Sequence, residues 1–250
     1  METKTVVITG ASSGIGKALA FEYAKRGYHL GLTARRLNLL EEIKQQVEQQ
    51  YSSVKVEILE LDVMDERAVF AVMSQFAERF RTLDVIIINA GVSLPCNPGT
   101  GKYEKIQKTF QTNLTGAIAT IEASVEILKR QKSGQIVGIS SVAAFRGLPG
   151  NAAYSASKAA LSTYMEGIRN HLRKHHIDVT VLHPGFIHTP LVEKLDTPVP
   201  FMISVEKGAR QIADLIEKRV YNSTIPVMPW SAVSKLMRAI PDKVWARFGR

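Results

Sequence analysis

A tyrosine and a lysine four residues apart are the side chains of this sequence best suited to proton transfer. Tyr154 and Lys158 lie in a stretch of good helix formers, so a helix would place both on one face. A phenol has an unperturbed pKa of roughly 10, and a neighbouring ammonium group stabilises the phenolate. Tyr154 is therefore a candidate general acid or base, with Lys158 lowering its pKa. Because such a pair also arises by chance, its interpretation depends on the surrounding sequence.

Ser141 and Asn113 provide part of that context. Ser141 follows a predicted strand, and the loop 143–151 contains glycines and a proline that permit a tight turn back toward Tyr154. A hydroxyl there would hold a carbonyl oxygen while Tyr154 gives that oxygen a proton. Asn113 lies inside a long helical stretch, where its side chain would either open the helix locally or anchor a water that relays protons toward Lys158.

A glycine-rich turn near the start of the chain predicts a dinucleotide site. It follows the apolar run 5–9 and opens a helical pattern, and its candidate binding residues are Gly10, Ser12, Ser13, Gly14, Ile15 and Gly16. Glycines let the backbone approach a pyrophosphate, and a helix amino terminus offers free N–H groups. An ordinary turn is the alternative, but the position between a first strand and a first helix favours a dinucleotide.

The ends of the next strands supply further candidate contacts. Arg35 and Arg36 stand where an NAD-selective site carries an acidic residue, so their charge favours the 2′-phosphate of NADP(H). NAD(H) remains the alternative, because two arginines that open a helix are also typical of solvated surface. Asp62, followed by Val63, would accept a hydrogen bond from the adenine amino group. Small residues after the fourth strand allow close approach to the backbone: Asn89, Ala90 and Gly91.

Apolar, β-branched runs alternate with longer helical patterns along the chain. This alternation predicts an α/β fold, a Rossmann-like doubly wound parallel sheet flanked by helices, in one domain with a C-terminal amphipathic extension. Strands are expected at 5–9, 29–33, 54–60, 85–88, 134–139 and 178–182, and helices at 15–26, 38–50, 66–80, 105–132, 152–175 and 205–218. We place the domain at 1–228, its cofactor half at about 1–135, its catalytic and substrate half at about 136–228, and a basic tail at 229–250.

Composition and charge narrow the class of protein. The chain has 250 residues, 45% of them hydrophobic, and its single cysteine excludes an internal disulfide. No run approaches the roughly 20 apolar residues of a membrane-spanning helix, and the first residues leave no room for a signal peptide, so we expect a cytoplasmic protein. The net charge of +9 is spread along the chain, which argues against nucleic-acid binding, and no Cys/His cluster has the spacing of a metal site.

The sequence resembles the classical short-chain dehydrogenase/reductase family over residues 4 to about 225. The resemblance rests on motifs in the family's order: the glycine-rich turn, Asn89-Ala90-Gly91, Asn113, Ser141, Tyr154 and Lys158. It implies hydride transfer between a nicotinamide and a carbonyl or alcohol. In that reaction Ser141 would orient the substrate and Tyr154 would be the general acid or base. Lys158 would bind the nicotinamide ribose, and Asn113 would complete a proton relay.

The resemblance also implies contacts at both ends of the cofactor. The segment 183–189 matches the family's Pro-Gly segment, which implies contacts with the nicotinamide end from Pro184, Gly185, Ile187 and Thr189. Ser13 stands where many NADP-dependent relatives carry a basic residue, so the 2′-phosphate would rest mainly on Arg35, with Ser12 or Arg36 in support. Relatives usually form homodimers or homotetramers, and the same assembly is expected here.

The tail and two loops leave the substrate and partners open. Basic residues alternate with apolar ones in the tail, Trp245 and Phe248 among them, so it would contact a membrane peripherally, close over the substrate pocket or meet a neighbouring subunit. Pro241 breaks the stretch in each case. Apolar loop residues favour a lipophilic ketone, aldehyde or acyl-type substrate: Phe145, Leu148, Leu191, Leu195, Phe201 and Met202. A cofactor-binding scaffold or NADP sensor with little turnover is the alternative from another class.

Overall fold

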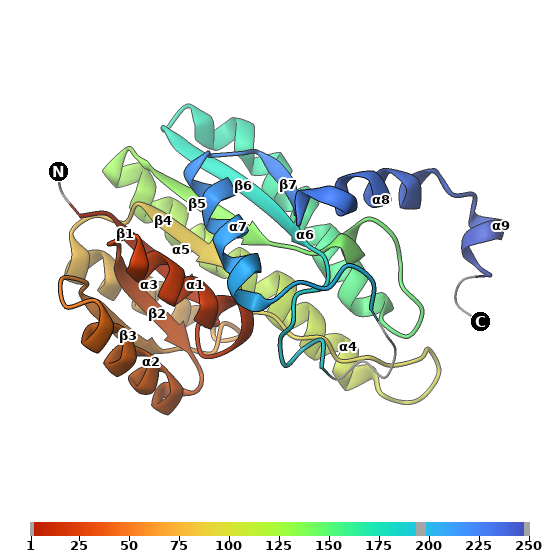
Figure 1. The fold of residues 1–250 in the computed structure, drawn as a ribbon, viewed down its shortest axis with the longest axis horizontal. Helices are drawn as coiled ribbons and strands as arrows, with labels where there is room; N and C mark the ends of the chain where they lie inside the picture. Colours follow the sequence, from red (N-terminus) through yellow and green to blue (C-terminus); the bar gives the residue numbers. More distant parts are fainter. Residues whose placement is uncertain (1–2, 194–198, 248–250) are drawn as a thin grey trace.

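The sheet at the centre of the molecule has seven parallel strands, shown in Figure 1. The computed structural model describes residues 3–193 and 199–247. The strand order is β3-β2-β1-β4-β5-β6-β7. The strands are β1 (Thr5–Thr9), β2 (His29–Ala34), β3 (Val56–Glu60), β4 (Val85–Ile88), β5 (Gly134–Ile139), β6 (Ile177–Pro184) and β7 (Asn222–Ile225). Every residue of β1, β4 and β5 is buried, as parallel strands covered on both faces require.

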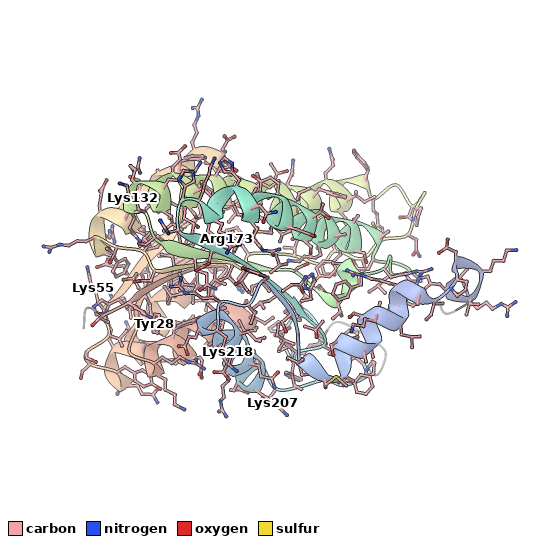
Figure 2. All side chains as sticks on the ribbon, turned by 90° about the horizontal axis from the view of Figure 1, so that it is seen from above. Tyr28, Lys55, Lys132, Arg173, Lys207 and Lys218 are labelled. Carbon is pink, nitrogen blue, oxygen red and sulfur yellow. The ribbon has the colours of Figure 1, made fainter. Side chains whose placement is uncertain are left out.

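Helices cover both faces of the sheet and divide the core into two clusters. One face carries α1 (Gly14–Lys25), α2 (Leu37–Gln50) and α7 (Val205–Glu217), and the other carries α3 (Glu66–Phe80), α5 (Gly116–Gln131) and α6 (Ala152–Arg173). In Figure 2, Arg173 at the end of α6 and Lys218 after α7 lie on opposite sides of the sheet. The doubly wound, single-domain α/β fold predicted from the sequence is confirmed.

The strand order reverses between β1 and β4, and this reversal positions the site. β1 pairs in parallel with β2 on one side and with β4 on the other. The chain leaves β1 and β4 in opposite directions, so a crevice opens at their carboxyl ends, where ligands of doubly wound sheets bind. The glycine-rich turn and residues 89–91 therefore meet at one edge of the sheet.

The structure corrects several predicted boundaries. The helical stretch expected at 105–132 begins at Tyr103, and β3 begins at Val56 rather than Val54. The stretch is divided near Asn113, one of whose predicted roles is to open the helix locally, into α4 (Tyr103–Phe110), a π-helical turn (Gln111–Thr115) and α5. The strand β7 was missed, because a four-residue polar edge strand has no apolar run to identify it. The tail forms α8 (Val227–Ala239) and α9 (Asp242–Trp245), separated near Pro241 as predicted, and both lie at one end of the molecule in Figure 1. Within residues 3–193 and 199–247, no helix combines the length and apolar character needed to span a bilayer.

Candidate active site

The glycine-rich turn between β1 and α1 forms a cradle that a side chain would fill. Gly10 and Gly14 have positive φ angles of 66° and 55°, which glycine adopts without strain. A Cβ atom on Gly16 would lie 2.4 Å from the carbonyl oxygen of Gly10. Ser13, the N-cap of α1, makes no side-chain capping hydrogen bond, so the cap does not use the first amide groups of the helix. This arrangement fits a pyrophosphate, because backbone N–H groups and the positive end of the helix dipole face it.

A basic corner closes one end of this cradle. Arg36 donates from Nη2 to Ser12 Oγ at 2.9 Å and to Ser13 Oγ at 2.8 Å. Arg35 Nη1 lies 3.8 Å from Asp62 Oδ2. Both arginines are exposed, so they remain accessible to an anion. Two guanidinium groups and two hydroxyls are suited to a phosphate ester, which accepts hydrogen bonds from all four.

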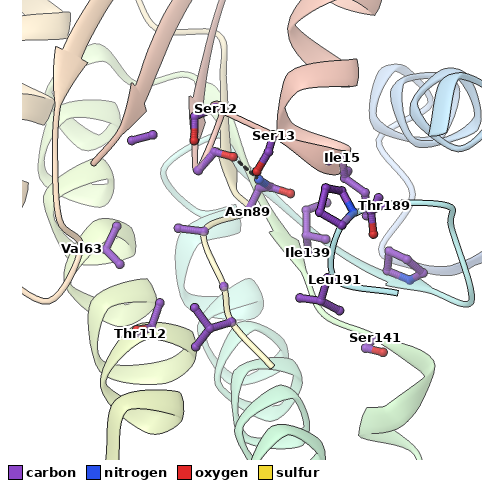
Figure 3. A pocket seen from close by; sticks show the side chains of 18 of the residues that line it. Ser12, Ser13, Ile15, Val63, Asn89, Thr112, Ile139, Ser141, Thr189 and Leu191 are labelled. Carbon is purple, nitrogen blue, oxygen red and sulfur yellow. Dashed lines mark hydrogen bonds between the residues drawn. The ribbon is translucent and has the colours of Figure 1, made fainter. Parts of the chain in front are cut away.

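One pocket runs from this corner to the tyrosine and lysine. Figure 3 shows Ser12 and Ser13 at one end, Ser141 at the other, and Val63 and Thr189 on opposite sides. Apart from Gly16, every residue predicted to bind cofactor lines the pocket: Gly10, Ser12, Ser13, Gly14, Ile15, Arg35, Arg36, Asp62, Val63, Asn89, Ala90, Gly91, Tyr154, Lys158, Pro184, Gly185, Ile187 and Thr189. Gly16 is buried behind the turn. Sequence reasoning missed further lining residues that carry no motif, among them Thr33, Leu61 and Thr112.

Tyr154 and Lys158 lie one turn apart on α6, next to the end of β5. The Lys158 side chain is almost fully buried, with 4% of the residue exposed, and its Nζ donates to the carbonyl oxygen of Ile139 at 2.8 Å. The same nitrogen lies 5.9 Å from the centre of the Tyr154 ring. Burial lowers the pKa of Lys158 to about 8. Lys158 therefore exchanges its proton more readily than an exposed lysine does.

Ser141 reaches Tyr154, as the loop between them predicts. Burial raises the pKa of Tyr154, and a hydrogen bond with the Ser141 side chain opposes this rise. The direction differs from the lowered pKa expected from Lys158, because the desolvation of the phenolate outweighs every other influence on this phenol. Tyr154 thus keeps its proton at neutral pH, which suits the donor of a proton better than the acceptor of one.

Asn113 anchors the backbone behind the pocket rather than lining it. It is fully buried in the π-helical turn, which is the local opening of the helix that its position predicts. Its Oδ1 accepts from Val92 N at 2.8 Å, and its Nδ2 donates to Val92 O at 2.8 Å and to Ser157 Oγ at 3.1 Å. The side chain therefore ties α6 to the segment that follows β4, next to Gly91.

A row of buried polar side chains, which sequence reasoning missed, contacts the backbone of Lys158. Ser140 Oγ donates to the carbonyl oxygen of Lys158 at 3.0 Å and lies 2.8 Å from Ser162 Oγ. Ser162 Oγ lies 3.1 Å from His183 Nε2. Burial lowers the pKa of His183 to about 4, so this histidine is neutral at physiological pH. Ser140 follows β5, Ser162 lies on α6 and His183 lies on β6, so no sequence spacing predicts that these side chains meet.

The substrate side of the site is only partly as expected. Leu191 lines the pocket beside Pro190. Phe145, Leu148, Phe201, Met202 and the described tail residues 229–247 do not line it. Instead, Trp230 of the tail packs against Phe186 and Phe201, with ring centres 5.7 and 6.0 Å apart. Two residues named in the sequence analysis, Leu195 and Phe248, lie outside the described residues.

Known proteins resemble this chain along most of its length. Residues 4–199 match the short chain dehydrogenase family. An uncharacterized oxidoreductase of Mycobacterium tuberculosis is 34% identical, over 97% of this chain and 96% of its own. The NADP-dependent 3-hydroxy acid dehydrogenase of Schizosaccharomyces pombe is 31% identical, over 96% of this chain and 88% of its own.

Solved structures share the fold as well. A short-chain dehydrogenase from Sphingobium yanoikuyae in complex with NADPH has a TM-score of 0.83 at 26% identity, covering 96% of this chain and 97% of that one. An alcohol dehydrogenase from Thermococcus sibiricus complexed with 5-hydroxy-NADP has a TM-score of 0.81 at 27% identity, covering 89% and 96%. The cradle, the lysine and tyrosine on α6 and these similarities lead to one conclusion: the chain belongs to the short-chain dehydrogenase family and is an NAD(P)-dependent dehydrogenase/reductase.

Proposed function

We propose that the protein reduces a lipophilic ketone, aldehyde or acyl-type substrate with NADPH. The observation that carries this proposal is the single pocket that joins the basic corner at Arg35 and Arg36 to Ser141, Tyr154 and Lys158. When bound, the nicotinamide supplies the hydride. Tyr154, whose raised pKa keeps it protonated, gives its proton to the carbonyl oxygen, and Ser141 holds that oxygen in place. Lys158 holds the nicotinamide ribose, and Asn113 keeps the neighbouring backbone in position.

The preference for NADPH rests on the basic corner. Ala34 leaves space at the end of β2, and the Arg36 guanidinium is already held beside two hydroxyl groups. Arg35 and Arg36 would offer charge-assisted hydrogen bonds to a 2′-phosphate, and NADH has no group to use them. The NADP-dependent relative from Schizosaccharomyces pombe and the NADPH and 5-hydroxy-NADP complexes support the same preference.

The lipophilic substrate class rests on apolar side chains in the segments after β6. Pro190, Leu191 and Val192 line the pocket, and Phe201 and Met202, which do not line it, are about half exposed. A substrate with an apolar body would bury these side chains from water.

The test is oxidation of NADPH and of NADH by the purified protein, followed against straight-chain aldehydes, 2-alkanones and quinones. We expect turnover that is faster with NADPH than with NADH and that improves with chain length. Absence of turnover with every carbonyl, combined with tight NADPH binding, would favour the scaffold or sensor instead.

Two partner proposals accompany this function. We infer a homodimer or homotetramer from the family, and light scattering during size-exclusion chromatography measures it. We also infer peripheral membrane contact, because the tail exposes Met228, Leu236 and Val244 together with Lys235 and Lys243. Deletion of residues 230–250 is then expected to abolish co-sedimentation with anionic liposomes, and unchanged co-sedimentation would contradict the contact.

A further inference from the structure

Arg146, in the loop after Ser141, is hydrogen-bonded to the C-terminal segment that contains α8 and α9. Arg146 donates from Nη1 to the carbonyl oxygens of Met237 at 2.9 Å and Ile240 at 2.7 Å, and from Nη2 to Asp242 Oδ1 at 2.5 Å. Met237 lies in the last turn of α8 and Ile240 directly follows the helix, where carbonyl groups lack a helical N–H partner. Arg146 therefore caps α8, and its side chain is only 14% exposed.

Aromatic contacts extend this grip along the loop. Trp245 of α9 donates from Nε1 to the carbonyl oxygen of Gly147 at 3.1 Å, and the Arg146 guanidinium lies 5.2 Å from the centre of the Trp245 ring. Phe145 stacks on His183 of β6 at 4.6 Å, and the Arg238 guanidinium of α8 covers its ring at 4.5 Å. This loop therefore contacts both the sheet, through Phe145, and the tail, through Arg146 and Gly147.

The segment from Ser141 to Phe145 is short and is held by local hydrogen bonds. Ser141 begins a 3-10 turn (Val142–Ala144), with hydrogen bonds from Ala143 N to Ser141 Oγ and from Phe145 N to Val142 O. Only this one turn separates Ser141 from Phe145 and Arg146. Arg146 therefore lies one short turn away from the hydroxyl that contacts Tyr154.

The far end of the same loop is held by the body of the domain. Leu148 N donates to Ser155 Oγ at 3.2 Å, and Cys96 N donates to Gly150 O at 3.0 Å. Both ends of the loop 141–151 are thus fixed to the body of the domain, whereas Arg146 and Gly147 in its middle are hydrogen-bonded to the tail. We propose that Arg146 is a positioning residue, which docks the C-terminal helices on this loop and thereby sets the size of carbonyl substrate that the site accepts.

The proposal rests on the proposed carbonyl reduction, and it assigns the tail a role in substrate selection. The hydrogen bonds to Met237 and Ile240 carry the docking, because Asp242 is fully exposed and its ion pair with Arg146 is screened by water. Lysine at position 146 would keep the charge but lose the forked geometry that reaches both carbonyls. The effect of Arg146→Lys is therefore expected to fall between those of wild type and Arg146→Ala.

The experiment compares wild type, Arg146→Ala, Arg146→Lys and Asp242→Asn, with Arg173→Ala on α6 as the matched control. Steady-state kinetics with NADPH and 2-alkanones of increasing chain length give KM and kcat separately. For Arg146→Ala we expect KM to rise about tenfold for the longest ketones, with less than about a twofold change for the shortest ketone, for kcat and for the KM of NADPH. Asp242→Asn and Arg173→Ala are expected to match wild type.

Docking of the tail is read directly from the Trp245 indole N–H signal in ¹H–¹⁵N spectra, since the chain has two tryptophans. We expect this signal to move and to exchange faster with water in Arg146→Ala. Trp245→Ala provides a second variant, expected to reproduce the chain-length dependence if Arg146→Ala does not fold.

An unmoved Trp245 signal in Arg146→Ala, or a KM that rises equally for all chain lengths or for none, would overturn the proposal. If wild type turns over no carbonyl, the proposed function fails and the inference fails with it. Turnover by wild type with unchanged chain-length profiles in both variants contradicts the inference alone.

Discussion

The Lys158 ammonium group donates a hydrogen bond to the carbonyl oxygen of Ile139 at 2.8 Å, which fixes this cation at the carboxyl end of β5. The partner is a neutral carbonyl, so it does not offset the cost of burying the charge. This is the physical reason why the pKa of Lys158 falls to about 8.

Removal of the Lys158 charge is expected to change how stability depends on pH. The folded pKa is about 8, below the unfolded value of 10.5, so between these values the unfolded chain binds more protons and stability rises with pH. The cost of burial is fully present below pH 8. The free energy of unfolding of Lys158→Met, taken relative to wild type, is therefore expected to be on the order of 3 kcal/mol higher at pH 7 than at pH 10.5. Urea unfolding at both pH values measures this, with exposed Lys25→Met as the control. A stability difference between Lys158→Met and wild type that is the same at both pH values would contradict the buried charge.

Loss of the Asn113 side chain is expected to destabilise the domain. Asn113→Ala removes the side-chain partner of the N–H and C=O of half-buried Val92, at a cost of about 1–3 kcal/mol for each group that water cannot reach. Asn113→Asp keeps the acceptor but cannot donate to Val92 O, and it adds a buried charge. Both variants should unfold at lower urea concentration than wild type, while exposed Asn38→Ala should not. An equally stable Asn113→Ala would show that the anchor is not needed.

The basic corner is expected to discriminate between the two nicotinamide cofactors. The double variant Arg35→Ala/Arg36→Ala loses the charge-assisted hydrogen bonds available to a 2′-phosphate, so kcat/KM for NADPH should fall about 100-fold. The value for NADH should change by less than about threefold. Parallel initial rates with both cofactors decide the matter, and Arg173→Ala again serves as the control. Equal losses with NADPH and NADH would place the 2′-phosphate elsewhere.

Closing the glycine cradle is expected to prevent cofactor binding. In Gly16→Ala the new Cβ would meet Gly10 O at 2.4 Å and Asn89 Nδ2 at 2.6 Å, so the turn must shift. We expect a stability loss of about 1–3 kcal/mol and much weaker NADPH binding by calorimetry. Gly167→Ala on α6 is the matched control. Its Cβ meets nothing within 4 Å, so it should stabilise the helix by about 0.5–1 kcal/mol. Normal NADPH affinity in Gly16→Ala would refute the cradle.

The sequence predicts what depends on local pattern. Apolar runs such as Val85–Ile88 identify buried strands, and the glycines before α1 identify the cradle, because both signals lie within a few neighbouring residues. Other contacts join segments far apart in the sequence, so no spacing reveals them. They include the hydrogen bonds among Ser140, Ser162 and His183 and the hydrogen bond from Arg146 to the carbonyl oxygen of Met237. The direction of the Tyr154 pKa shift was also out of reach, since it depends on how fully the phenol is desolvated.

Tyr154→Phe tests the central proposal most directly, because it removes the phenol oxygen and keeps the ring. The measurement is the single-turnover rate of NADPH oxidation with a saturating carbonyl substrate, together with the Kd for NADPH. If Tyr154 donates the proton, the rate falls by about 100-fold or more while the Kd stays within about twofold of wild type. A wild-type rate in Tyr154→Phe would contradict its role as the acid.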